Sequence, residues 1–523
     1  MVSVRSQLLS HPILFAAPRV PGLPAGEQEL LDKLVELWRV KQPRNALRQR
    51  YADGKIRPDN LGVAVPGDLV DLIGVVVGWP AKAVTALADR ISWDGVDQGP
   101  SDADRYGLTD LLDANSFGVE IGQIIVSALT QSVAFVTACP GDAASGEPDV
   151  VIAGRSAQWG AALWDRTRRR LAAGLTVDDV DDLGAPISMT LYTPDEIIHL
   201  ATSGSGWSRE AAVEHQLGRV PMEALPFEPS LDRPMGRSRI SRDVMSITQR
   251  AMRTILRDDL ASELFTAPGM LLRGVDADVF AQLKEWSWRL GAVKGLSRDE
   301  EGELPEVDWI PQQSTQPLVD QLRELACEFA GATSLPLSSL GIVQDNPSSA
   351  EAIAASREDL CIKAERAMRT WSGPLSRVYQ DAVMLRDGLT EPPDGLRRAR
   401  TRWGDPSRPS VVSRSDAVTK QIAAIGWLAD SPVVLEKLGY TQAEIDRLMA
   451  DKKRAEAGTT LDRLTALTRP QQPPDGGNAP AAQEPGQAVG GPTTSRPAST
   501  RSASPSEPES TPQTRPNASA SGA

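Results

Sequence analysis

Residues 238–265 carry apolar side chains at helical spacing over a long stretch, and this feature limits the possible folds most. At about 1.5 Å per residue, a helix over these residues is about 42 Å long. Pro268 and Gly269 end it, a second apolar helix begins near Pro317, and a third helix is expected over 350–385. Two helices around a small insert, followed by a loop and a longer helix, predict a stalk-like or ring-forming body. The apolar positions of the first helix are Ile240, Val244, Ile247, Ala251, Ile255, Leu260 and Leu264.

The remaining segments predict an α+β fold that is mainly α. Helical patterns occupy 27–90 and 108–129. Within 132–230, short β-like runs at 133–136, 150–152, 187–192 and 196–200 are separated by Gly, Pro and Asp clusters. Residues 469–523 hold 11 of the 40 prolines and no Leu, Ile, Met, Phe, Tyr or Trp. Such a segment buries too little apolar surface to offset its ordering entropy, so we expect a disordered C-terminal tail.

Composition excludes several functional classes. The 523-residue chain has 56 Lys and Arg against 69 Asp and Glu, a net charge of −13, which argues against a cationic coat for nucleic acid but not against a channel. With three cysteines, three histidines and no nucleotide-binding or nucleophile motif, the sequence predicts no catalytic, cofactor-binding or metal-binding residues. We therefore expect neither an enzyme nor a bound cofactor. No stretch of about 20 uncharged apolar residues occurs, so we expect a soluble protein without membrane contact.

The loop before the third helix has an unusual charge pattern. From Glu324 to Ser356 there is no Lys or Arg, and four acids give the stretch a charge of −4. If this loop lined a passage for DNA, the phosphates would meet no cation that could hold them. The alternative is that its serines only cap the helix that starts at Ala350.

Four motifs in order carry a resemblance to a known family. They are His215 to Pro221, Arg233 to Ile240, Leu335 to Gly341, and Asn346 to Ile353, with weaker agreement at 51–54, 78–79, 164–169 and 403–406. In order and spacing they resemble the portal proteins of tailed bacteriophages, in the siphophage branch common among phages of actinobacteria. The likeness covers roughly residues 27–450.

The resemblance implies a portal fold with a wing, stem, clip, tunnel loop and crown, assembled as a twelve-subunit ring at one capsid vertex. The segments implied are an N-terminal extension 1–26, wing 27–237, stem helix 238–265, clip 266–314, second stem helix 315–333, tunnel loop 334–349, wing 350–414, crown 415–468 and tail 469–523.

The same resemblance implies function, partners and site residues. Double-stranded DNA passes through the ring during packaging and ejection, and the terminase large subunit and head-tail adaptor dock on it. Major capsid and scaffolding proteins are further partners, and the protein belongs to the virion after assembly in the host cytoplasm. We expect Gln344, Asp345, Asn346, Ser348 and Ser349 to face DNA, Ile240, Val244, Ile247, Ile255, Leu322 and Phe329 to form the subunit interface, and Asp299, Glu300 and Glu301 to dock the motor or adaptor.

Two other classes remain as alternatives. A helical scaffold or adaptor without a DNA channel also fits long helices, and an enzyme is a more distant third. A closed ring with a central hole separates the portal from the scaffold, whereas an enzyme requires measurable turnover.

Overall fold

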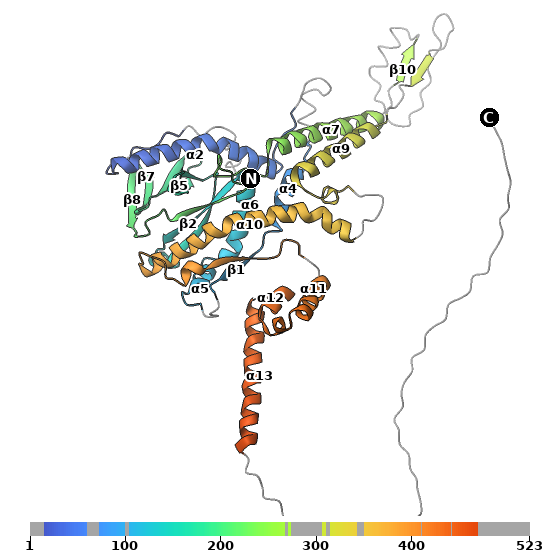
Figure 1. Cartoon of the computed structure of the whole chain (residues 1–523). Helices are drawn as coiled ribbons and strands as arrows, with labels where there is room; N and C mark the ends of the chain where they lie inside the picture. Colours follow the sequence, from blue (N-terminus) through green and yellow to red (C-terminus); the bar gives the residue numbers. More distant parts are fainter. Residues whose placement is uncertain are drawn as a thin grey trace, which may run out of the picture. The chain divides into compact units, whose positions relative to one another are not determined.

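The computed structural model describes residues 15–59, 73–99, 104–204, 206–266, 270–273, 306–309, 314–342, 350–408, 411–440 and 442–468. The chain divides into two compact units, 1–413 and 414–523. The larger unit is a mixed α+β body dominated by helices, as the sequence predicts (Figure 1).

The structure describes four helices in the N-terminal part of the larger unit. They are α2 (Ala25–Ala52), α4 (Trp79–Ala88), α5 (Leu108–Ala114) and α6 (Phe117–Gln131). The sequence predicts one helix over 108–129, but the chain breaks at Asn115 and Ser116. The Asn115 side chain accepts from the Ile152 amide and donates to the Val150 carbonyl, and Ser116 adopts a φ of 49°. The hydrogen bonds of Asn115 to β3 therefore divide the predicted helix into α5 and α6.

Two antiparallel sheets form the β part. The larger has the order β4-β5-β6-β7-β8 and the smaller the order β3-β2-β9, and two further strand pairs are β1 with β12 and β10 with β11. Helix α2 packs on one face of the larger sheet through Leu34, Trp38 and the strand residues Leu175 and Ile198. The bounds are β1 (Trp93–Asp97), β2 (Val133–Pro140), β3 (Val150–Ser156), β4 (Gly160–Asp165), β5 (Arg170–Val180), β6 (Pro186–Tyr192), β7 (Glu196–Ser203), β8 (Gly206–Glu214), β9 (Met222–Pro226), β10 (Met270–Arg273), β11 (Glu306–Trp309) and β12 (Arg400–Trp403).

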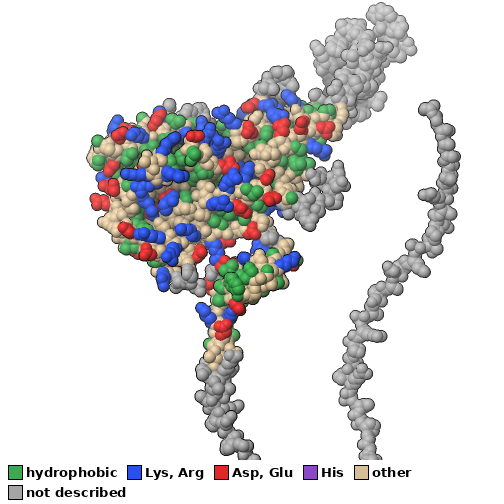
Figure 2. All heavy atoms as spheres, in the orientation of Figure 1, with side chains coloured by type: hydrophobic (Ala, Val, Ile, Leu, Met, Phe, Trp, Pro, Cys, Tyr) green, Lys and Arg blue, Asp and Glu red, His purple; other side chains and the backbone are tan. Residues whose placement is uncertain are grey.

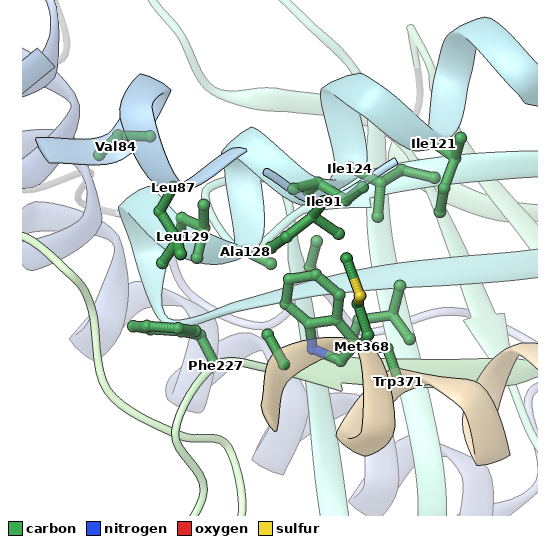
Figure 3. Close-up of a cluster of buried hydrophobic side chains, with 14 of the residues drawn as sticks. Val84, Leu87, Ile91, Ile121, Ile124, Ala128, Leu129, Phe227, Met368 and Trp371 are labelled. Carbon is green, nitrogen blue, oxygen red and sulfur yellow. The ribbon is translucent and has the colours of Figure 1, made fainter. Parts of the chain in front are cut away.

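Three long helices complete this unit. Helices α7 (Arg242–Thr266) and α9 (Gln316–Thr333) run side by side as a hairpin, and α10 (Ala350–Asp387) crosses the body below the sheets (Figure 1). Figure 3 shows how α10 closes the main core: Met368 and Trp371 meet Ile124, Ala128 and Leu129 of α6 and Phe227, which follows β9. This core joins helices α4, α5, α6, α7, α9 and α10 with the three-stranded sheet, whereas the five-stranded sheet packs in two other clusters.

The smaller unit has a minimal core. It begins at residue 414, within α11 (Val411–Ala424). Its other helices are α12 (Val433–Leu438) and α13 (Gln442–Thr468), and a 3₁₀ turn lies at Gly426–Asp430. Val418, Leu428 and Val434 form its apolar cluster. None of the described helices of either unit is long and apolar enough to cross a membrane.

Candidate functional site

The α7–α9 hairpin is held by polar contacts along its length. Arg250 of α7 forms two hydrogen bonds with the Glu328 carboxylate of α9, at 2.6 and 3.3 Å. One helical turn further, the Thr254 hydroxyl donates to the Gln321 side chain at 3.2 Å. Both ion-pair partners are partly exposed, so this pair contributes at most about 1 kcal/mol and acts mainly to fix the register of the helices.

The predicted interface residues occupy two kinds of position. Ile240, Val244, Ile247 and Phe329 are buried inside the single chain, where α4, α6 and α10 also contribute to the cluster. The chain's own helices therefore cover these four side chains, and their part in a subunit interface stays a prediction. Ile255 and Leu322 lie further along the hairpin and are only partly buried against the same cluster. These two remain proposals for contact with a neighbour.

The root of the hairpin is fixed by a buried arginine. The Arg239 guanidinium donates to the Ala83 carbonyl of α4 and to the Thr333 carbonyl of α9, and only 6% of the residue is exposed. Burial lowers the pKa of Arg239 to about 10, which leaves it charged at neutral pH. Two backbone carbonyls, rather than a carboxylate, accept the hydrogen bonds of this charged group. Arg239, which lies just before α7, therefore acts as a joint between α4, α7 and α9.

The chain before Arg239 is also fixed. The Arg239 amide donates to the Leu129 carbonyl and the Ser238 hydroxyl to the Thr130 carbonyl, both at the end of α6. Gly236 has a φ of 72°, and a Cβ there would lie 2.2 Å from the Phe227 carbonyl oxygen. The left-handed backbone and the lack of space together require glycine at this turn.

Two ion pairs attach α10 to the segment around β9. Arg219 pairs with Asp381 at 2.6 Å, and Arg377 forms a two-bond pair with Glu223 at 2.6 and 2.8 Å. Only 1% of the Asp381 side chain is exposed. Burial raises the pKa of Asp381 to about 7 although Arg219 opposes the shift, because desolvation outweighs the attraction of the pair.

The remaining predicted site residues cannot be placed. Gln344, Asp345, Asn346, Ser348 and Ser349 lie outside the described residues, although α10 begins directly after them at Ala350. Asp299, Glu300 and Glu301 also lie outside the described residues.

Sequence reasoning missed the structural roles of Arg219, Arg239 and Asp381. Two of them occur within the motifs 215–221 and 233–240, and Asp381 interrupts an apolar run of α10 between Tyr379 and Ala382. A charged residue on the buried face of a predicted helix requires a partner, and this signal could have identified Asp381. Within the described ranges, no group of three or more His, Cys, Asp or Glu is arranged to hold a metal ion.

The described residues thus form a helical hairpin, fixed at its root, on an α+β body. The model of the phage portal protein family of the SPP1 Gp6-like type matches residues 74–393. The chain belongs to this family, and its function is that of a phage portal at the capsid vertex, where it serves DNA packaging.

Portal proteins of two mycobacteriophages are similar to the chain along most of its length. It is 26% identical over 442 residues to the portal protein of Mycobacterium phage D29, covering 82% of this chain and 90% of the relative. For the portal protein of Mycobacterium phage L5 the identity is 28% over 381 residues, covering 71% and 77%.

Solved structures similar to the chain come from gene transfer agent (GTA) particles. The neck of the native particle, computed with C12 symmetry, has a TM-score of 0.38 and 16% identity, covering 75% of this chain and 98% of that chain. The virion of the native particle has a TM-score of 0.36 and 15% identity, covering 73% and 94%.

Proposed function

We propose that twelve copies of the chain form a closed ring through which double-stranded DNA enters the capsid and later leaves it. The family match over residues 74–393 carries this proposal, because portal proteins form rings at the junction of capsid and tail. The Arg239 joint supports it: a hairpin fixed at its root holds a constant orientation, which a symmetric ring requires of every subunit.

The loop before α10 forms the narrowest polar collar around DNA in this proposal. Gln344, Asp345, Asn346, Ser348 and Ser349 present acceptors and amides, and the stretch from Glu324 to Ser356 has no Lys or Arg. A collar without cations guides the duplex without the salt-dependent hold that phosphate contacts create.

The insert between α7 and α9 is the proposed docking region for other proteins. It carries the acidic residues Asp299, Glu300 and Glu301. Such surface charges increase the association rate of a partner more than they increase its affinity. The terminase large subunit docks there during packaging and the head-tail adaptor afterwards. Capsid and scaffolding proteins contact the wing, and assembly takes place in the host cytoplasm.

Electron microscopy of the purified full-length protein, viewed along the symmetry axis, tests the proposal. A closed ring with a central hole wide enough for duplex DNA supports a portal, and the number of subunits is counted directly. Open filaments or discrete dimers without a hole would instead favour a helical scaffold.

A further inference from the structure

The second half of α2 and the residues directly after it have a charge opposite to that of the rest of the chain. Residues 39–57 contain seven Lys and Arg and one acid, a net charge of +6, whereas the whole chain carries −13. The other residues therefore carry −19 (−13 minus +6). Such a concentration of positive charge on one helix marks a surface that attracts an anionic partner.

This surface is the exposed side of α2. The opposite side of α2 is buried, where the Trp38 indole donates to the Gln158 carbonyl and the Asn45 amide to the Ala157 carbonyl, each at 2.8 Å. We define the α2 basic surface as the exposed residues Val40, Lys41, Pro43, Arg44, Leu47 and Arg50. Figure 2 shows Lys and Arg side chains next to hydrophobic ones along this helix.

The half-buried Arg48 lies beside the cations of the α2 basic surface and donates to the Gln131 carbonyl at 3.1 Å, so it also supports the fold. Among the residues that the structure describes, Lys41, Arg44 and Arg50 have no carboxylate within ion-pair distance. Burial lowers the pKa of Arg48 to about 10, and the charge of Arg44, four residues earlier, adds to this effect. Like charges at this spacing destabilise a helix by about 0.2–0.5 kcal/mol, so a bound anion relieves a local cost.

The apolar residues between these cations indicate which kind of anion binds. Val40 is 60% exposed and Leu47 is 40% exposed, and with Pro43 they form a strip along the outward side of α2. An apolar centre flanked by arginines is typical of protein interfaces, whereas a surface for the phosphate backbone gains nothing from exposed Val and Leu.

We propose that the α2 basic surface docks an acidic segment of a partner protein, one that places apolar side chains on the strip and carboxylates on the cations beside it. The surface lies before residue 74, where the match to the family model begins, and it adds a contact beyond the proposed channel function. Electrostatic attraction speeds the encounter, and the apolar strip distinguishes protein from other polyanions.

Fluorescence anisotropy with the full-length protein tests this proposal. The first probe is a helical peptide of about 20 residues with Leu and Glu on one face. A second peptide of the same charge has Ser in place of Leu, and the third probe is a DNA duplex. Each is measured at about 50 mM and about 200 mM salt, because electrostatic contacts weaken over this range.

Two double variants and a control separate charge from apolar contact. Lys41→Glu with Arg44→Glu reverses the charge, and Val40→Asp with Leu47→Asp removes the apolar strip. Arg366→Glu with Arg369→Glu is the matched charge control, because both residues are exposed on α10 and have the same spacing of three residues as Lys41 and Arg44. Equal thermal unfolding of all variants shows that each one is folded.

The proposal expects the Leu–Glu peptide to bind at least about tenfold more tightly than the Ser peptide, a difference of about 1.4 kcal/mol. Each α2 double variant loses at least this factor, and the control keeps the original affinity. The proposal is overturned if neither peptide binds, or if the control loses as much affinity as the charge variant. Tighter binding of the duplex, unaffected by Val40→Asp with Leu47→Asp, would assign the surface to nucleic acid instead.

Discussion

The Asp381 carboxylate on α10 lies 2.6 Å from the Arg219 guanidinium, 162 residues earlier in the chain. The Oδ1 atom of Asp381 accepts the hydrogen bond from Arg219, while Oδ2 has no hydrogen-bond partner among the described residues. The pair is therefore incompletely satisfied, and the burial that raises the pKa of Asp381 has a direct consequence for stability.

The Asp381 pair makes stability fall as pH rises. The folded-state pKa is about 7 and the unfolded value is 3.8, so between these values the folded protein binds a proton that the unfolded chain lacks. The free energy of unfolding then decreases by about 1.4 kcal/mol per pH unit up to about pH 7 and is level above it. The free energy of unfolding is measured against pH for the Asp381→Asn variant as well. Subtracting this curve removes the contributions of the other titrating groups. Denaturant unfolding at pH 5 and at pH 8 gives this difference, and a constant difference contradicts the raised pKa.

Arg239→Met should destabilise the hairpin root. The carbonyls of Ala83 and Thr333 lose their donor while remaining buried, which costs about 2–4 kcal/mol. Arg239→Lys retains the charge but spans the two carbonyls poorly, so an intermediate loss is expected. Hydrogen exchange followed by mass spectrometry should show faster exchange at the start of α7 and the end of α9. Faster exchange confined to the sheets would place the weak point elsewhere.

Aspartate at two positions of α7 separates the core from a subunit interface. Ile247 is buried within its own chain, so Ile247→Asp should destabilise the monomer by at least about 3 kcal/mol. Ile255 is only partly buried, so Ile255→Asp should leave a folded monomer that fails to form rings if a neighbour covers this position. Thermal unfolding and light scattering measure the two effects. Intact rings from Ile255→Asp would remove this residue from the interface.

The sequence predicts those elements best that have one strongly apolar face. The long apolar stripes correctly predict α7, α9 and α10, and the β-branched runs fall in β2, β3, β6 and β7. Strand β8 was not predicted because most of its residues face solvent and give no alternating pattern. Strand β5 was missed because small residues occupy it, including Gly174, where a Cβ would lie 2.2 Å from the Met222 sulfur.

For the candidate site, the local sequence pattern predicts which residues are buried but not which segments cover them. An apolar stripe predicts that Ile247 is buried but not whether its own chain or a neighbour covers it. Here α7 forms part of a core that also includes α4, α6 and α10, segments far away in sequence. The pairing of Arg219 with Asp381 likewise depends on how β9 meets α10, which no short motif encodes.

Charge reversal in the proposed docking turn should slow partner binding. Replacing Asp299, Glu300 and Glu301 with Lys removes the attraction that steers a partner, and the association rate should fall by about tenfold at low salt. Ring formation should be unaffected, which electron microscopy checks. Surface plasmon resonance with the packaging motor or adaptor measures the rates, and unchanged association would remove this turn from the docking region.

A single cation in the proposed collar should retard DNA. Asp345→Lys would place up to twelve lysines around the duplex in a twelve-subunit ring, and each adds a phosphate contact that salt weakens. Packaging should become slower, with the defect relieved as salt rises. Asp345→Asn is the matched control, because it removes charge without adding a cation. A normal packaging rate and genome length for the Lys variant at every salt concentration would show that this loop does not meet DNA.

The joint at Arg239 also determines how the protein bears mechanical load. The first half of α7, up to Leu256, packs into the core, and the second half extends beyond it, so a force near Thr266 acts as a torque on this packed half and on the bonds of Arg239 before it. Weakening this root would let the hairpin tilt under such a force, so the subunits of a ring would no longer share one orientation.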